Sequence, residues 1–139
     1  MRKVLYCLIG LTILSTNLII VGCGTKTPEF DGVYQSEKVD KYWHYARFYE
    51  DGTAIIVSST GNPDEIIRWF KKENIENKGL SHGLYEINSD RLVFSTTSAQ
   101  GVIDYDGMIK DDAIIMDSYS HITGHRSNRK YRFVKLSEN

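Results

Sequence analysis

Two pairs of side chains in this sequence have the residue types and spacing that catalysis or metal binding requires. His121 and His125 are four residues apart, and Asp104 and Asp106 alternate along one stretch of chain. On a helix the histidines would face one metal ion, and paired carboxylates can serve as general acid and base. However, Gly124 favours a loop around the histidines, and period-two spacing places both aspartates on the outer face of a strand. We therefore expect solvated side chains here, with no metal site and no catalytic residue.

Other enzyme motifs are missing. The hydroxyl run at residues 95–98 has no Gly-x-Ser-x-Gly elbow around it, and no glycine-rich phosphate loop occurs. We expect no cofactor. The least favoured alternative is an envelope hydrolase, which would need His44, His121 or His125 within hydrogen-bond reach of a carboxylate in one cleft.

Composition excludes some partners and indicates a fold class. The chain has 139 residues, 17 basic and 18 acidic side chains, and a formal net charge of −1. No basic block occurs, so we expect no nucleic-acid partner. Nine tyrosines and only two prolines favour strands. The two cysteines, Cys7 and Cys23, both fall in the N-terminal segment.

That N-terminal segment has a basic start and a long uncharged run. Arg2 and Lys3 precede the 18 uncharged residues 4–21. The pattern is typical of a secretory signal, and its length is near the lower limit for a membrane span. An ordinary signal and an uncleaved anchor therefore stay open as alternatives. Both put the globular part outside the cytoplasm.

The end of the run, Ile20-Val21-Gly22-Cys23, resembles the lipobox of bacterial lipoproteins. The resemblance implies that the Cys23 thiol receives a diacylglycerol and that a signal peptide, residues 1–22, is removed. Residues 23–30 would form a lipidated tether, and residues 31–139 the domain. Because two or more acyl chains anchor a protein stably, the resemblance implies a membrane-bound lipoprotein of the bacterial cell envelope.

Beyond the tether, short runs of strand-forming residues alternate with turn signals. Eight strands joined by short connections predict an all-β, antiparallel up-and-down barrel, which leaves no exposed edge. The expected strands are residues 32–35, 42–49, 54–58, 83–87, 92–97, 102–110, 114–120 and 130–136.

One short helix, about residues 63–73, is expected between the third and fourth strands. Asn62 is a capping residue, Pro63 suits the first helical position, and Glu65 has the capping-box spacing. Lys71 and Lys72 lie near the end, where cations are favourable. We expect this helix to cover one end of the barrel as a lid.

Alternation predicts which side chains point into the barrel. The expected inward set is Ile103, Tyr105, Gly107, Ile109, Leu92, Phe94, Tyr85, Ile87, Ile114, Met116, Tyr131 and Phe133. Ala46, Phe48 and Ile56 join it in one register of the hairpin at Asp51-Gly52. A one-residue slip would place Tyr45 and Val57 inside instead.

Two Gly-x-Tyr triplets and a basic residue on the last strand carry a second resemblance. Gly32-Val33-Tyr34 and Gly83-Leu84-Tyr85 resemble the Gly-x-Trp motif of the lipocalin-like group of small barrels, which occurs in bacterial envelope lipoproteins. Arg132 stands where that group often has a basic residue packed across the barrel end. The resemblance implies a lipocalin-like barrel over most of residues 30–136.

The favoured hypothesis is a non-catalytic, lipid-anchored envelope protein that binds a small apolar or amphiphilic ligand, or an envelope protein. The expected pocket residues are Tyr85, Phe94, Tyr105, Tyr131 and Phe133. An eight-stranded barrel encloses just enough space for side chains or one small ligand.

The alternative is a packed barrel that acts as an interaction or structural protein. Its binding surface would be an exposed aromatic patch around Trp43 or Trp69.

Other aromatic residues, Tyr45, Tyr49 and Tyr119, suit either a pocket or a core. Arg47 faces solvent or a ligand, depending on the hairpin register. A cavity of about 300 Å³ or more would favour ligand binding.

Overall fold

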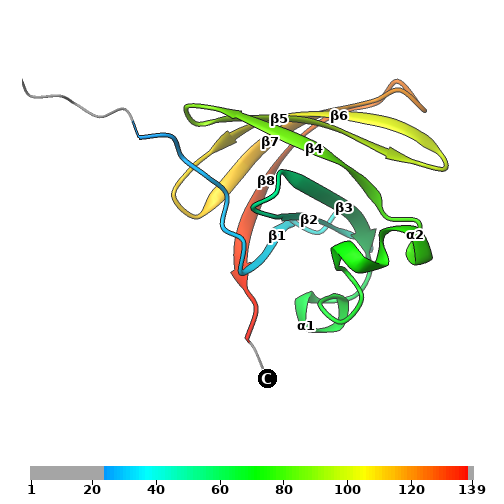
Figure 1. The fold of residues 1–139 in the computed structure, drawn as a ribbon. Helices are drawn as coiled ribbons and strands as arrows, with labels where there is room; N and C mark the ends of the chain where they lie inside the picture. The colour runs from blue at the N-terminus through cyan, green and yellow to red at the C-terminus, as the bar shows by residue number, and fades with distance from the viewer. Residues whose placement is uncertain (1–23, 138–139) are drawn as a thin grey trace, which may run out of the picture.

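The computed structural model describes residues 24–137, which form a barrel of eight strands with a helical connection beside it (Figure 1). The strands are β1 (Gly32–Ser36), β2 (Trp43–Phe48), β3 (Thr53–Ser59), β4 (Ser81–Asn88), β5 (Arg91–Ser98), β6 (Gly101–Ile109), β7 (Ala113–Ser120) and β8 (Arg126–Lys135). The helical pieces are α1 (Pro63–Ile66), η1 (Lys72–Asn74) and α2 (Ile75–Lys78). None of the helices in the described part has the length and apolar character needed to cross a bilayer.

The strands follow sequence order around the barrel. Each pairs antiparallel with the next, and β1 also pairs antiparallel with β8, where Tyr34 lies opposite Phe133. This pairing removes the sheet edges, which would otherwise leave backbone N–H and C=O groups unpaired. The expected all-β, eight-stranded up-and-down barrel is confirmed, and its architecture is compatible with a lipocalin-like fold.

The β2–β3 hairpin adopts the first of the two registers considered. Ala46 lies opposite Ile56, and Phe48 lies opposite Ala54. Gly52 has a φ of +87°, a conformation that glycine adopts without a steric penalty. Alternation along β2 and β3 therefore sends Ala46, Phe48 and Ile56 into the barrel.

An inner core fills the barrel at one end. Phe48 makes edge-to-face contacts with Tyr34, Tyr85 and Phe94, at centroid distances of 5.7, 5.4 and 5.7 Å. Such aromatic pairs are stabilising beyond the area they bury. All the side chains expected inside belong to this core or pack against it, and Gly107 is buried among them. The period-two prediction is confirmed.

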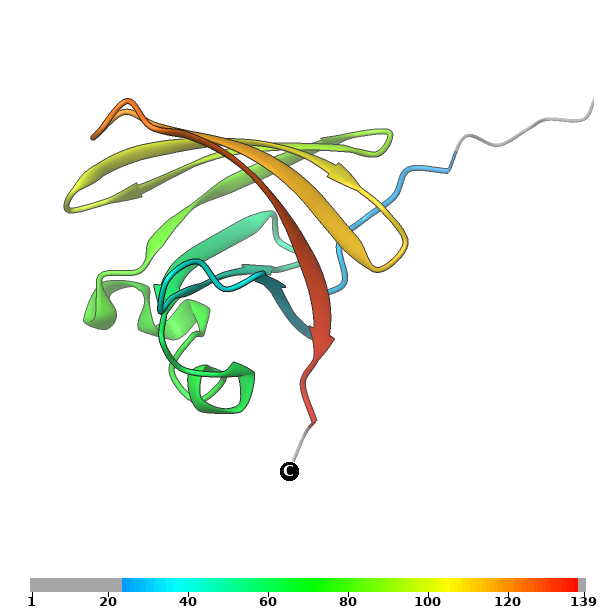
Figure 2. The same cartoon turned by 180° about the vertical axis from the view of Figure 1, so that it is seen from behind.

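A second core lies on the outside of β1, β2 and β3. Val33, Tyr45 and Ile55 point away from the barrel and are covered by Ile66 and Phe70 of the helical connection. These strands are therefore buried on both faces. The helical connection packs mainly against the side of the barrel (Figure 2), and only Trp69 and residues 78–80 of it line the cavity at the open end. The expectation that the helix covers an end as a lid is wrong.

The helix begins as predicted and then breaks. The side chain of Asn62 accepts a hydrogen bond from the Glu65 N–H, and the Glu65 carboxylate accepts one from the Asn62 N–H, at 3.1 and 2.8 Å. This reciprocal pair is a capping box. The connection therefore consists of three short pieces, α1, η1 and α2. The residue that caps α2, Gly79, is left-handed with a φ of +61°. Phe70, between α1 and η1, is fully buried in the second core.

The residues before β1 close one end of the barrel. The Lys26 N–H donates to the Ser89 carbonyl at 2.9 Å, and the Glu29 N–H donates to the Tyr34 hydroxyl at 2.8 Å. Phe30 packs against the inner core. Figure 1 shows this segment leaving beside the β4–β5 and β6–β7 turns, on the side away from α2.

In both Gly-x-Tyr triplets, the glycine is required because a neighbouring strand leaves no space for a side chain. A Cβ at Gly32 would lie 2.4 Å from the Val134 carbonyl oxygen, and one at Gly83 would lie 1.8 Å from the Ser95 carbonyl oxygen. Both glycines let a neighbouring strand approach closely. Arg132, by contrast, is exposed on the outer face of β8, because the alternation that buries Tyr131 turns Arg132 outward. The expectation that it packs across the barrel end is wrong.

Candidate functional site

The open end of the barrel holds a cavity of about 790 Å³, here named the mouth cavity. It lies at the end opposite the segment that precedes β1, and strands β2 to β8 contribute to its lining. Its polar lining residues are His44, Ser58, Lys78, Ser81, Ser98, Gln100, Ser118, Ser120, Thr123, His125, Ser127 and Arg129. Its apolar and aromatic lining residues include Ile56, Trp69, Leu80, Ile103, Tyr105, Ile122 and Tyr131.

Two tyrosines join the mouth cavity to the inner core. The Tyr105 ring stacks on Phe94 at 4.7 Å between centroids. Burial raises the pKa of Tyr105 to about 12, and burial also raises the pKa of Tyr131 well above its usual range. Both hydroxyls are therefore neutral at physiological pH. A neutral phenol can donate one hydrogen bond to a ligand and accept others.

His44 and Ser58 are opposite each other on β2 and β3, and both point inward. Ser58 Oγ lies 2.7 Å from His44 Nδ1. Burial, with a further contribution from the Arg129 charge, lowers the pKa of His44. The imidazole is therefore neutral at pH 7, and acidification would add a positive charge to the cavity.

Arg129 brings a permanent positive charge into the cavity from β8. Its Nη1 donates to Ser127 Oγ at 2.6 Å, and Ser127 Oγ lies 2.7 Å from Ser118 Oγ. Within residues 24–137, no carboxylate lies within 4.0 Å of the Arg129 guanidinium. A guanidinium has five N–H donors in a fixed plane, so it can bind a ligand in addition to its bonds to Ser127 and Tyr131.

A second concavity, here named the outer groove, follows the outside of β5 to β8 and has a volume of about 830 Å³. Asp104 Oδ1 accepts from Ser95 Oγ and Asp104 Oδ2 meets His121 Nε2, both at 2.6 Å. These contacts, Ser95 first, lower the pKa of Asp104. The carboxylate lies between the two, so Ser95 is not activated by His121 as in a Ser–His pair.

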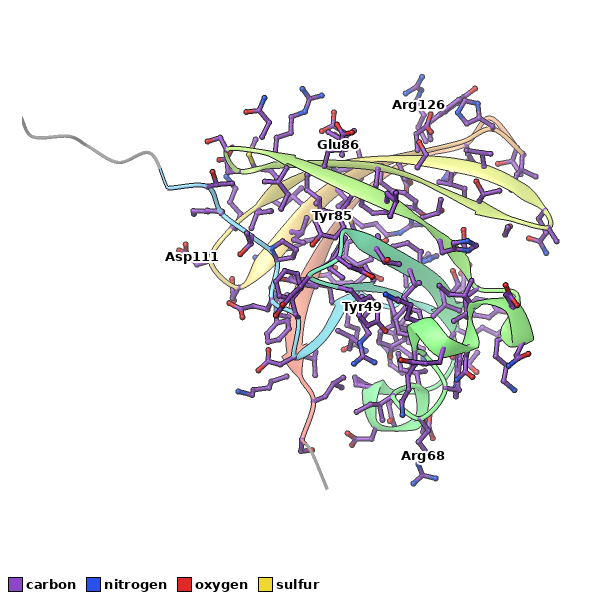
Figure 3. All side chains as sticks on the ribbon, viewed as in Figure 1. Tyr49, Arg68, Tyr85, Glu86, Asp111 and Arg126 are labelled. Carbon is purple, nitrogen blue, oxygen red and sulfur yellow. The ribbon has the colours of Figure 1, made fainter. Side chains whose placement is uncertain are left out.

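The other groove carboxylates also have neighbours. Arg91 Nε donates to Asp106 at 2.9 Å, and the Asn128 amide donates to Asp117 at 2.8 Å. Arg126 lies in the same groove and extends from the outer face, as Figure 3 shows. Within the described residues, no three His, Cys, Asp or Glu side chains are grouped to hold a metal ion.

The five residues expected to form a pocket divide into two sets. Tyr105 and Tyr131 line the mouth cavity. Phe94, Tyr85 and Phe133 belong to or pack against the inner core, and Tyr85 points inward in Figure 3, where its hydroxyl donates to the Tyr49 carbonyl at 2.7 Å. The lipidation prediction at Cys23 concerns a residue outside the described range 24–137.

Two of the four histidines, His44 and His125, line the mouth cavity, and the other two lie outside it. His121 and His125 follow β7, in or beside the exposed β7–β8 turn, with His121 on the outer face and His125 lining the mouth cavity. His82 is exposed on β4. His44 alone among the described histidines is half-buried in the cavity.

The aromatic patch residues pack against the second core, and Arg47 lies on the same outer side of the barrel. Trp43 and Trp69 are half-buried and pack against this core, and Trp69 also lines the mouth cavity. Arg47 points out of the barrel and its Nη1 donates to the Phe70 carbonyl at 3.0 Å. Its guanidinium also lies over the Tyr49 ring. Arg47 therefore faces neither open solvent nor a barrel ligand.

Sequence reasoning did not place Arg129 and His44 inside the barrel, although the signal was present. Tyr131 and Phe133 were expected inside, and continuing the alternation backward places Arg129 inside as well. The expected last strand began at residue 130, which excluded it. The same step backward from Ala46 reaches His44.

Comparison with models of protein families, with curated proteins and with solved structures returned no match for this chain.

Proposed function

We propose that this protein is a lipid-anchored binding protein of the bacterial cell envelope, which holds a small amphiphilic ligand in the mouth cavity of a lipocalin-like barrel. The observation that carries the proposal is the mouth cavity itself, about 790 Å³ at one end of a closed barrel. Ligand sites in proteins have volumes of about 300–1,000 Å³. A fully packed barrel acting through its surface would not need this space.

The position of the tether supports the anchored arrangement. Residues 26–30 are bound across the closed end of the barrel, through Lys26 and Glu29. A lipid on Cys23 would then hold the closed end nearest the bilayer. The mouth cavity would open away from the anchoring membrane, so the ligand would arrive from the aqueous side.

Intact mass spectrometry of the protein purified from bacterial membranes tests the anchor. We expect a chain that starts at Cys23 and carries a diacylglycerol. Cys23→Ser should abolish lipidation, while Cys7→Ser, in the segment to be removed, should change nothing in the mature product. An unmodified chain retaining residues 1–22 would overturn the anchor.

Binding of an amphiphile panel to the full chain, followed through tryptophan fluorescence, tests the ligand role. Ser120→Trp would fill the mouth cavity from β7 and should weaken binding by at least about tenfold. The matched control is Tyr119→Trp, the neighbouring residue on the outer face, which should bind as the unmodified chain does. Equal binding by both variants would show that the ligand lies elsewhere.

A second candidate, an envelope hydrolase, is favoured by the 2.7 Å contact between Ser58 Oγ and His44 Nδ1. A serine paired with a histidine can act as a nucleophile. Against this, none of the carboxylates in the described range is hydrogen-bonded to His44. Turnover of an ester panel that is lost in Ser58→Ala would favour this candidate.

A further inference from the structure

The charges of the mouth cavity have one sign. Arg129 and Lys78 line it, together with the histidines His44 and His125, whereas no Asp or Glu is present among its described lining residues. The chain as a whole has nearly equal numbers of the two signs, 17 basic and 18 acidic side chains. Each wall of the cavity is therefore neutral or positive.

Arg129 is half-buried, whereas Lys26, Arg91 and Lys135 on the outside of the barrel are exposed, and each of these three lies within salt-bridge distance of a carboxylate. The neighbours of the Arg129 guanidinium include the Ser127 hydroxyl, at 2.6 Å, the Tyr131 hydroxyl and the His44 imidazole. Removing a charge from water without a counter-ion is costly. An anionic ligand would supply that counter-ion, and a guanidinium binds carboxylate and phosphate groups in a bidentate manner.

Hydroxyl groups surround this charge from several strands. The hydroxyls of Ser118 on β7 and Ser127 on β8 are 2.7 Å apart. The Ser81 hydroxyl on β4 donates to the Thr96 hydroxyl on β5 at 2.8 Å. Serine hydroxyls both donate and accept hydrogen bonds. They match the hydroxyl groups of a sugar-like molecule better than an alkyl chain.

We propose that the ligand of the mouth cavity is a hydroxylated organic anion, whose carboxylate or phosphate group binds Arg129 and whose hydroxyl groups bind the surrounding serines. This inference rests on the proposed binding function and specifies its ligand class. The same chemistry occurs in free sugar acids and sugar phosphates and in the phosphoglycerol headgroup of a lipid.

Isothermal titration calorimetry on the full chain, purified as the host processes it, tests this class. The probes are glucuronate, glucose 6-phosphate and neutral glucose. We expect the two anions to bind at least about tenfold more tightly than glucose, because hydrogen bonds to charged groups are the stronger ones. Vesicles of phosphatidylglycerol, with phosphatidylcholine as control, distinguish a lipid headgroup from a free solute.

Arg129→Gln removes the charge and should weaken anion binding by about tenfold or more. The matched control is Arg132→Gln on the same strand, since Arg132 is exposed on the outer face and does not line the cavity. Glucose binding as tight as anion binding, or equal anion affinity in Arg129→Gln and the unmodified chain, would overturn the inference. The proposed function would survive that result if amphiphiles still bound, and would fall only if no probe of either panel bound.

A second measurement covers the case in which Arg129→Gln does not fold. Ser58 and Arg129 interact with His44, and the other titratable lining residues of the cavity are Lys78, His125, Tyr105 and Tyr131. Protonation of His44 adds a positive charge, so anion affinity should rise as the pH falls from about 7.5 to about 5.5. His44→Gln should flatten this rise while leaving Lys78 and His125 in place. An equal rise in both proteins, or none in the unmodified chain, would contradict the inference.

Discussion

The mouth cavity and the outer groove have similar volumes, about 790 and about 830 Å³, but the charged residues of the cavity are all basic whereas the groove contains both signs. In the groove, Asp104 meets His121 and Asp106 meets Arg91, so each carboxylate has a neighbouring cation or donor. In the cavity, Arg129 has no carboxylate within 4.0 Å among residues 24–137. A surface whose charges compensate one another is complete without a ligand. In the cavity, the anion that we propose as the ligand would supply the missing counter-charge.

The largest expected effect is on the free energy of unfolding, and it distinguishes the inner from the outer face of β7. Met116 is 1% exposed inside the barrel, and its neighbour on β7, Ile115, is 37% exposed outside. Met116→Ala should lower the free energy of unfolding by about 2–5 kcal/mol, because it leaves a cavity in the inner core. Ile115→Ala should lower it by less than about 1 kcal/mol. Denaturant titration measures both, and equal losses would contradict the assignment of the two faces.

A carboxylate introduced into the mouth cavity should neutralise part of its positive charge, as neighbouring charges do in the groove. Ser127→Asp would put an acidic group beside Arg129, where Ser127 Oγ now accepts at 2.6 Å. Anion affinity should fall by about ten- to a hundredfold, because the guanidinium gains an internal partner. Calorimetry with glucuronate measures this. Ser95→Asp in the groove is the control and should leave affinity unchanged, and a loss of the same size there would contradict the localisation.

The pH dependence of stability should separate His44 from the outer histidines. Burial lowers the pKa of His44 below the usual value of about 6.5 that the residue has in an unfolded chain. The unfolded state therefore binds the proton more tightly, so stability is present above about pH 6.5 and falls as the pH drops below it. Thermal melting from pH 7.5 downward should show this fall, and His44→Gln should reduce it. An unchanged slope in the variant would assign the fall to other groups.

The smallest effect is expected in the outer groove. Asp106→Asn removes the charge that Arg91 contacts, but both side chains are about half exposed. Exposed ion pairs contribute little and are screened by salt. Anion affinity should change by less than about twofold. A larger change in calorimetry would show that the groove and the cavity are coupled.

Alternation along single strands predicted most of the barrel correctly. Ile103, Tyr105 and Ile109 on β6 lie inside as expected, because one face of that strand meets the core and the other meets solvent. The cap at Asn62 and Glu65 was also predicted, since capping depends on neighbours within one turn. Both features need only local chain geometry.

The β2–β3 hairpin shows where that reasoning becomes ambiguous. Ala46 and Phe48 lie in the inner core, but Tyr45 is buried too, on the outer face beneath Phe70. A strand covered on both faces has no polar side to identify its register. The helical connection that covers it comes later in the sequence, and alternation within β2 cannot reveal it.

The sequence by itself determined the strands, their inward faces and the capped start at Asn62, because these depend on period-two alternation and short-range hydrogen bonds. Only the tertiary structure decided that the helical segment lies against β1–β3 and that Arg129 and His44 meet in one cavity. Arg129 and His44 are far apart in the chain and lie on strands β8 and β2, which are brought together only when the barrel closes through β1. Long-range closure, and not local propensity, places an unpaired positive charge among hydroxyl groups.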